Sequence, residues 1–130
     1  MQAMEKAELL QRTQAFALRI LKLVDQLPNT AAGRAIANQL VRSGTSIGAN
    51  YRAACRARSR AEFAAKLGVV AEEPHETVYW LGLIIDGALA PRHRLADLVK
   101  EANELTAIFT SGRRTASKSN IKPQASNMHS

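Results

Sequence analysis

Residues 9–27 read LLQRTQAFALRILKLVDQL, and this stretch decides the fold. Its apolar and small residues recur at steps of three and four, which is the spacing of one face of an α-helix. The face consists of Leu9, Thr13, Phe16, Ile20, Leu23 and Leu27, with Leu10, Ala17, Leu21 and Val24 beside it. Because this apolar face is wide, we expect a helix over about 4–27 that packs against two neighbouring helices.

Three more segments show helical periodicity, over about 31–57, 60–86 and 92–109. Pro28-Asn29-Thr30 separates the first two helices, because proline cannot continue a helix and Asn or Thr can cap the next one. Ser59-Arg60-Ala61-Glu62 has the form of a capping box and predicts the start of the third helix. Gly87 to Pro91 predicts the break before the fourth helix.

Glycine and proline inside these helices carry structural information. Gly44 and Gly48 each cost about 1 kcal/mol relative to alanine in a helix, so we expect another helix to pack closely against them. Pro74 removes a backbone hydrogen bond from the third helix and predicts a kink there.

Connections of roughly two to six residues require consecutive helices to fold back on one another, so the sequence predicts an all-α, up-down-up-down four-helix bundle. We assign residues 1–111 to this bundle. Residues 112–130 are rich in Ser, Asn and Lys with almost nothing apolar, and we interpret them as a disordered basic tail.

The whole chain of 130 residues has a formal net charge of +7, which favours an anionic partner. A single cysteine, Cys55, excludes an internal disulfide. The first residues lack the layout of a secretion signal, and no apolar run approaches the length of a membrane span. We therefore expect a cytoplasmic protein that does not associate with a membrane.

An arginine stripe occupies the predicted second helix and the residues that follow it. Its members are Arg34, Arg42, Arg52, Arg56 and Arg60. At about 100° per residue they fall within one arc opposite the apolar face. No acidic residue lies between Asp25 and Glu62. Such a row presents bidentate donors to phosphates and predicts binding to the backbone of RNA or DNA, with Arg113, Arg114 and Lys118 assisting.

Two alternatives for the stripe remain open. The arginines are a solvated face, or they pair with acidic residues of the same chain or of a neighbouring subunit. An antiparallel hairpin folded at Ser59 would bring Arg42 close to Glu76, so this arginine is a candidate for internal pairing. Arg58 falls toward the apolar side of the predicted helix, which favours a structural role.

A second unusual surface lies on the third helix, where Val69, Trp80, Leu83 and Ile84 flank the core stripe. Tryptophan is enriched at subunit interfaces, so we interpret this flank as an oligomer interface. The alternative is that Trp80 belongs to the ordinary core.

Enzymatic chemistry finds little support in the sequence. His75, His93 and His129 are scattered, and no phosphate-binding loop, nucleophile elbow or Glu-x-x-His pair occurs. Glu72, Glu73 and Glu76 spread around the helix circumference, which favours a salt-bridged or solvated cluster over a metal site. We expect no catalytic residues, no metal and no cofactor.

The segment Gln39-Leu-Val-Arg-Ser-Gly-Thr-Ser-Ile-Gly-Ala-Asn-Tyr-Arg-Ala-Ala-Cys-Arg-Ala-Arg-Ser59, with Glu76-Thr-Val-Tyr-Trp-Leu81 downstream, resembles the bacterial four-helix bundle protein family. That family is also named for proteins encoded in intervening sequences of large-subunit ribosomal RNA genes. The resemblance covers roughly residues 10–110. Pro74 departs from it, since relatives tend to carry a helix-forming residue there.

The resemblance implies a homopentamer, and it does not imply an enzyme. The family also looks like the accessory protein of diversity-generating retroelements, a basic pentamer thought to bind nucleic acid and a reverse transcriptase. The expected partners are therefore further copies of the chain, structured RNA or DNA, and a reverse transcriptase or another protein. The rival hypothesis is an assembly scaffold whose arginines contact acidic partners.

Overall fold

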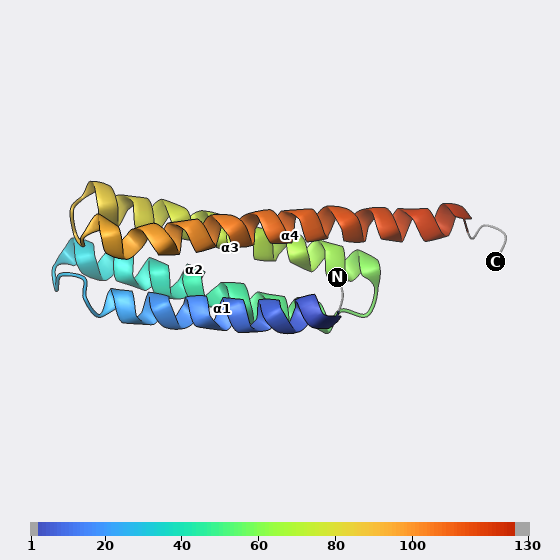
Figure 1. Ribbon diagram of the computed structural model, residues 1–130, viewed down its shortest axis with the longest axis horizontal. Helices are drawn as coiled ribbons and strands as arrows, with labels where there is room; N and C mark the ends of the chain where they lie inside the picture. Colours follow the sequence, from blue (N-terminus) through green and yellow to red (C-terminus); the bar gives the residue numbers. More distant parts are fainter. Residues whose placement is uncertain (1–2, 127–130) are drawn as a thin grey trace.

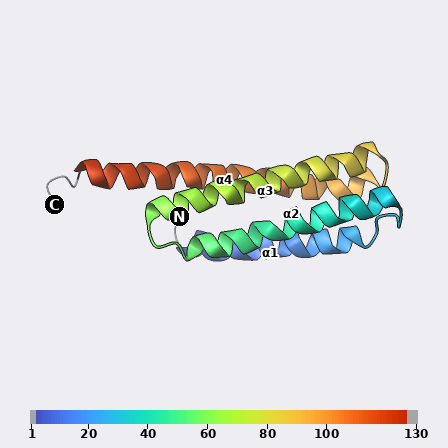
Figure 2. The ribbon, with the colours of Figure 1, turned by 180° about the vertical axis from the view of Figure 1, so that it is seen from behind.

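The computed structural model describes residues 3–126 and confirms the four-helix bundle (Figure 1). The helices are α1 (Ala3–Val24), α2 (Ala31–Cys55), α3 (Arg60–Asp86) and α4 (Arg92–Ser126). Consecutive helices run antiparallel, as both views show (Figures 1 and 2). Over the described part of the chain, no helix is both long and apolar enough to cross a membrane.

Side-chain caps fix where α2 and α3 begin. The Thr30 hydroxyl accepts the backbone N–H of Gly33 at 3.1 Å, and the Ser59 hydroxyl accepts that of Glu62 at 3.0 Å. The Glu62 carboxylate accepts the N–H of Arg58 at 2.9 Å, one residue before the serine that a standard capping box would pair with it. The predicted start of the third helix is therefore confirmed, with the glutamate contact moved by one residue.

The predicted apolar faces meet in one core. Tyr51 of α2 packs against Phe109 of α4, with ring centroids 5.2 Å apart. The largest fully buried side chains are Tyr51, Phe16, Phe109, Ile20, Leu40, Ile47, Leu67, Leu81, Ile84, Leu95, Leu105 and Val70.

Gly44 and Gly48 allow α1 to approach α2, as predicted. A Cβ atom added to Gly44 would stand 2.9 Å from Ile20 Cγ1, and one added to Gly48 would stand 3.2 Å from Thr13 Oγ1. Thr13 is itself buried, and its hydroxyl donates to the Leu9 carbonyl at 2.9 Å. Close helix contact therefore offsets the cost of two glycines inside α2.

Polar side chains join α2 to α3 inside the core. The hydroxyl oxygens of Thr77 and Ser43 lie 3.0 Å apart, and Thr77 also hydrogen-bonds the Glu73 carbonyl at 2.9 Å. Both residues are fully buried. Pro74, one turn earlier, is also buried, and α3 spans it as a single helix of 27 residues.

The predicted end of the fourth helix is wrong. The sequence predicts a helix that ends near residue 109, but α4 is 35 residues long in all and ends at Ser126. Ala116 is 5% exposed and the Arg113 stem lies against Gly68 of α3, so packing persists beyond Phe109. The helix then extends past the end of the bundle (Figure 1). Residues 127–130 of the predicted tail, including His129, lie outside the described residues.

Candidate nucleic-acid interface

The arginine stripe does not form one surface, because its members lie at different levels of the bundle. Arg34 and Arg52 are eighteen residues apart on α2, which is about 27 Å along a helix. Arg34 lies by the α1–α2 turn, where its guanidinium donates to the Asn29 side chain at 3.0 Å. Arg34 and Arg52 therefore belong to opposite ends of the molecule.

Arg42 is neutralised within the chain, as its expected position near Glu76 predicts. Its guanidinium donates to the Glu76 carboxylate and lies 3.7 Å from a Glu73 carboxylate oxygen. The same Glu76 oxygen accepts the Trp80 indole N–H at 2.9 Å. These contacts occupy Arg42 with the acidic residues of α3, which leaves it poorly suited to bind a phosphate.

The remaining arginines of the stripe gather at the α2–α3 turn. Arg52 lies in the last turn of α2, Arg56 is its C-cap residue, and Arg60 is the first residue of α3. Arg58, which we had placed toward the apolar side, is exposed. The cause is that α2 ends at Cys55 and not at residue 57, so Arg58 belongs to the turn and joins the basic cluster.

α4 brings three more cations to the same end of the bundle. A Cβ atom added to Gly68 would stand 3.1 Å from Arg113 Cδ, and Gly68 lies only two turns from the start of α3. Arg114 and Lys118 follow along α4 and are exposed. We name this cluster the basic end, and it comprises Arg52, Arg56, Arg58, Arg60, Arg113, Arg114 and Lys118.

The charges of the basic end are largely uncompensated. Within the residues that the structure describes, only Arg12 and Arg42 form ion pairs, and neither belongs to this cluster. The acidic residues toward this end are Glu5 and Glu8 of α1 and Glu62 of α3. The Glu62 carboxylate already accepts the Arg58 backbone N–H. The guanidinium groups therefore remain available to an external anion.

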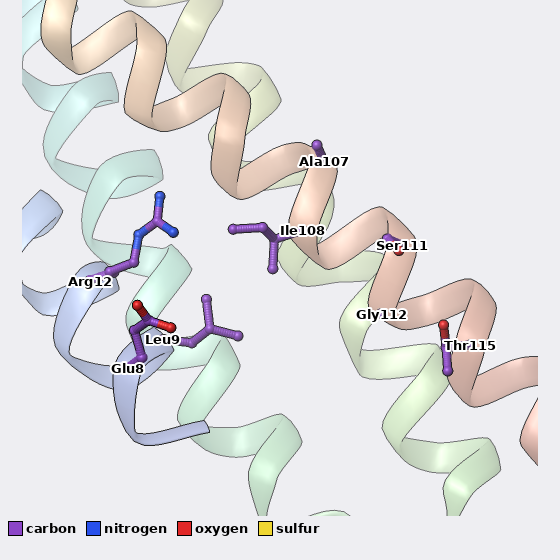
Figure 3. Close-up of a pocket in the computed structure, with 8 residues that line it drawn as sticks. All are labelled: Glu8, Leu9, Arg12, Ala107, Ile108, Ser111, Gly112 and Thr115. Atoms are coloured by element: carbon purple, nitrogen blue, oxygen red, sulfur yellow. The ribbon is translucent and has the colours of Figure 1, made fainter. Parts of the chain in front are cut away.

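A groove between α1 and α4 opens near the basic end (Figure 3). Its volume is about 470 Å³, with Leu9 of α1 and Ile108 of α4 as apolar walls and Glu8, Ser111 and Thr115 as polar ones. The groove exists because α1 packs extensively on α2 but barely on α4. Its lining contains no histidine or cysteine.

Arg12, which also lines this groove, connects α1 to α4. Its Nε and Nη2 atoms donate to the two carboxylate oxygens of Glu101 at 3.0 and 2.6 Å, and Nη2 also donates to Glu104 at 3.0 Å. The hydrogen bonds with Glu101 raise the pKa of Arg12 further above its ordinary value. Arg12 therefore acts as a clasp between α1 and α4 and is not a free cation.

A second groove, of about 390 Å³, runs between α3 and α4 from Arg113 to His75. Gly68 and Ala71 give it a wall of small residues, and Thr110 adds a hydroxyl group. This groove was not predicted from the sequence, although Gly68 inside α3 indicates the close approach of a side chain from another helix.

The predicted oligomer interface is only partly on the surface. Val69 is 50% exposed and Leu83 is 36% exposed, whereas Trp80 is half-buried against the core. Ile84 is fully buried in its own subunit, so its assignment to an intersubunit contact is wrong. The reason is that Ile84 lies one turn from the buried Leu81, on the edge of the core stripe.

The acidic cluster of α3 serves the α2–α3 contact. Glu73 and Glu76 face Arg42, as described above, and Glu72 is exposed. No group of three His, Cys, Asp or Glu residues in the described part of the chain is arranged to hold a metal ion.

Comparison with known proteins places this geometry among related bundles. Residues 5–111 match the family described as 23S rRNA-intervening sequence protein. A crystal structure from Bacteroides thetaiotaomicron, of a protein of unknown function from the S23 ribosomal protein family, is similar with a TM-score of 0.77 and 34% identity. The alignment covers 84% of this chain and 97% of that one. A search of curated proteins gave no match.

Proposed function

Because the chain belongs to the 23S rRNA-intervening sequence protein family, we propose that it is a non-enzymatic, homo-oligomeric protein that binds the backbone of RNA or DNA. The observation that supports this proposal is the basic end. Seven cations from α2, the α2–α3 turn, α3 and α4 gather at one end of the bundle, and the described residues offer them no ion-pair partner.

The chemistry of these side chains suits phosphate groups. Six of the seven are arginines, and a guanidinium group donates two parallel hydrogen bonds to a phosphate. Such contacts position a nucleic acid without reading its bases. The proposed binding is therefore weakly dependent on sequence and strongly dependent on salt.

Self-association belongs to the same proposal. The family resemblance implies a pentamer, and exposed apolar side chains on α3, such as Val69 and Leu83, are consistent with a subunit contact. In a cyclic oligomer every copy would present its basic end at the same radius, so the positive potentials would add.

The test is whether protein purified from cells carries nucleic acid. We expect an absorbance ratio typical of bound nucleic acid that falls after nuclease treatment in high salt. The double variant Arg56→Gln/Arg60→Gln should carry much less bound nucleic acid and keep the oligomer. Arg34→Gln, at the opposite end of α2, is the matched control and should retain both. Equal retention by all three proteins would contradict the assignment to the basic end.

The rival function is an assembly scaffold, and the pairing of Arg42 with Glu73 and Glu76 is the observation that favours it. Charge reversal by Arg52→Glu/Arg56→Glu separates the two hypotheses. Dissociation of the oligomer would support the scaffold. Loss of nucleic acid from an intact oligomer would support the basic end as the binding surface.

A further inference from the structure

Large apolar side chains are exposed on two helices only, within the residues that the structure describes. On α1, Leu18 is 53% and Leu21 is 41% exposed; on α3, Val69 is 50%, Tyr79 is 60% and Leu83 is 36% exposed. We name these the α1 patch and the α3 patch. Exposed apolar clusters of this kind mark interaction sites.

The two patches lie on separate sides of the subunit. α1 and α3 both pack on α2, but they do not pack against each other, so they are diagonal neighbours in the bundle. The two patches of one subunit therefore do not form one continuous surface, and each needs its own contact with another molecule.

Charge distinguishes the surroundings of the two patches. From the start of α1 to the end of α2 there are seven cations, Lys6, Arg12, Arg19, Lys22, Arg34, Arg42 and Arg52, and three acidic residues, Glu5, Glu8 and Asp25. Lys22 lies one turn from Leu18. After Arg60, α3 carries a single lysine or arginine, Lys66, and five acidic residues: Glu62, Glu72, Glu73, Glu76 and Asp86. The α1 patch thus belongs to a basic half of the subunit, and the α3 patch belongs to an acidic helix.

One acidic group beside the α3 patch lacks a donor. A carboxylate oxygen of Glu73 is buried without a hydrogen-bond partner, and its nearest cation is Arg42 at 3.7 Å. Glu72 is exposed and, among the described residues, forms no ion pair. The buried Glu73 oxygen is served from inside the subunit by Arg42, whereas a basic surface from another molecule would complement the exposed Glu72 carboxylate.

We infer that the α1 patch of one copy of this chain packs on the α3 patch of the next copy. Two different, complementary surfaces make a heterologous contact, and repeating it by rotation produces a closed ring. This inference rests on the self-association included in the proposed function and adds which faces meet. It also explains why both patches are apolar while their surroundings carry opposite charge.

The test uses one variant in each patch, Leu18→Asp and Leu83→Asp, with particle mass measured by light scattering. Each variant alone should fall to the monomer mass of 14.2 kDa. Mixed together they should form dimers and nothing larger, because one variant keeps an intact α3 patch and the other keeps an intact α1 patch. Ala96→Asp, at an exposed site on α4, is the control and should assemble as the unaltered protein does.

Three results would overturn the inference. Dimers from each variant alone would show that like patches pair with like. Assembly unaffected by either change would show that neither patch is used. If the unaltered protein is a monomer, the proposed self-association and this inference are both wrong. If that monomer still retains nucleic acid, the proposed binding at the basic end is unaffected. Helical circular dichroism reports folding, and the milder pair Leu21→Gln and Val69→Gln replaces any variant that fails to fold.

Discussion

Gly44 of α2 lies directly against Ile20 of α1, so that a methyl group at Gly44 would stand 2.9 Å from Ile20 Cγ1. Ile20 is fully buried. This contact sets the distance between the first two helices. It therefore fixes the side of α2 that is covered and the side that carries Arg34 and Arg52.

Replacing Gly44 with alanine should destabilise the protein. The gain in helix propensity is about 1 kcal/mol, and forcing a methyl group against Ile20 costs about 1–3 kcal/mol. We expect a net loss of about 1 kcal/mol in the free energy of unfolding, measured by urea denaturation at fixed protein concentration.

Gly82→Ala is the matched control for Gly44→Ala. Gly82 also lies inside a helix, α3, but nothing would meet its Cβ atom within 4 Å. This change should stabilise the protein by up to about 1 kcal/mol, because only the propensity term remains. Stabilisation by both substitutions would mean that α1 and α2 are not in close contact at Gly44.

The Ser43–Thr77 hydrogen bond should show strong coupling in a double-mutant cycle. Thr77→Val keeps the shape of the side chain but leaves the buried Ser43 hydroxyl without its partner, at a cost of about 1–3 kcal/mol. Adding Ser43→Ala removes the orphaned group, so the double variant should lose less than the sum of the single losses. Strictly additive losses in thermal unfolding would contradict a bond between the two hydroxyl groups.

The Arg12 clasp should govern local opening between α1 and α4. The Arg12 and Glu101 side chains are 28% and 20% exposed, and a partly buried bidentate pair of this kind is expected to contribute about 1 kcal/mol. Arg12→Ala should speed amide hydrogen exchange in α1. Since its hydrogen bonds raise the pKa of Arg12, the guanidinium stays charged and no loss of the clasp by arginine deprotonation is expected near neutral pH.

Arg19→Ala is the control for the clasp. Arg19 is an exposed arginine of the same helix, and it has no ion-pair partner among the described residues. Its removal should leave exchange in α1 unchanged. Equal acceleration by both substitutions would assign the effect to net charge instead of the contact with Glu101.

Local patterns in the sequence were sufficient for the architecture. Thr30 and Ser59 marked helix starts because capping depends on residues within one turn. Gly44 indicated close packing because a glycine destabilises a helix interior, and close contact with another helix is the usual compensation. The pairing of Arg42 with Glu76 followed from the hairpin geometry, since the turn at Ser59 sets which levels of α2 and α3 face each other.

Features that depend on the third dimension were harder to predict. α4 continues past Phe109 because Ala116 is buried and Arg113 packs against Gly68. A count of large apolar residues does not detect these contacts. Ending α2 two residues early turned Arg58 outward, since each residue rotates a helix by about 100°. A helical wheel also ignores distance along the axis, which is why Arg34 seemed to share a surface with Arg52.

The salt dependence of RNA binding tests the central proposal most directly. Fluorescence anisotropy with one labelled RNA hairpin should give an affinity that falls linearly with salt on logarithmic axes. For Arg56→Gln/Arg60→Gln, the slope should decrease in magnitude by roughly 0.7–0.9 for each phosphate contact removed, whereas Arg34→Gln should keep the full slope. An affinity that does not change with salt, or a slope that Arg34→Gln lowers as much as the basic-end variant does, would contradict phosphate binding at the basic end.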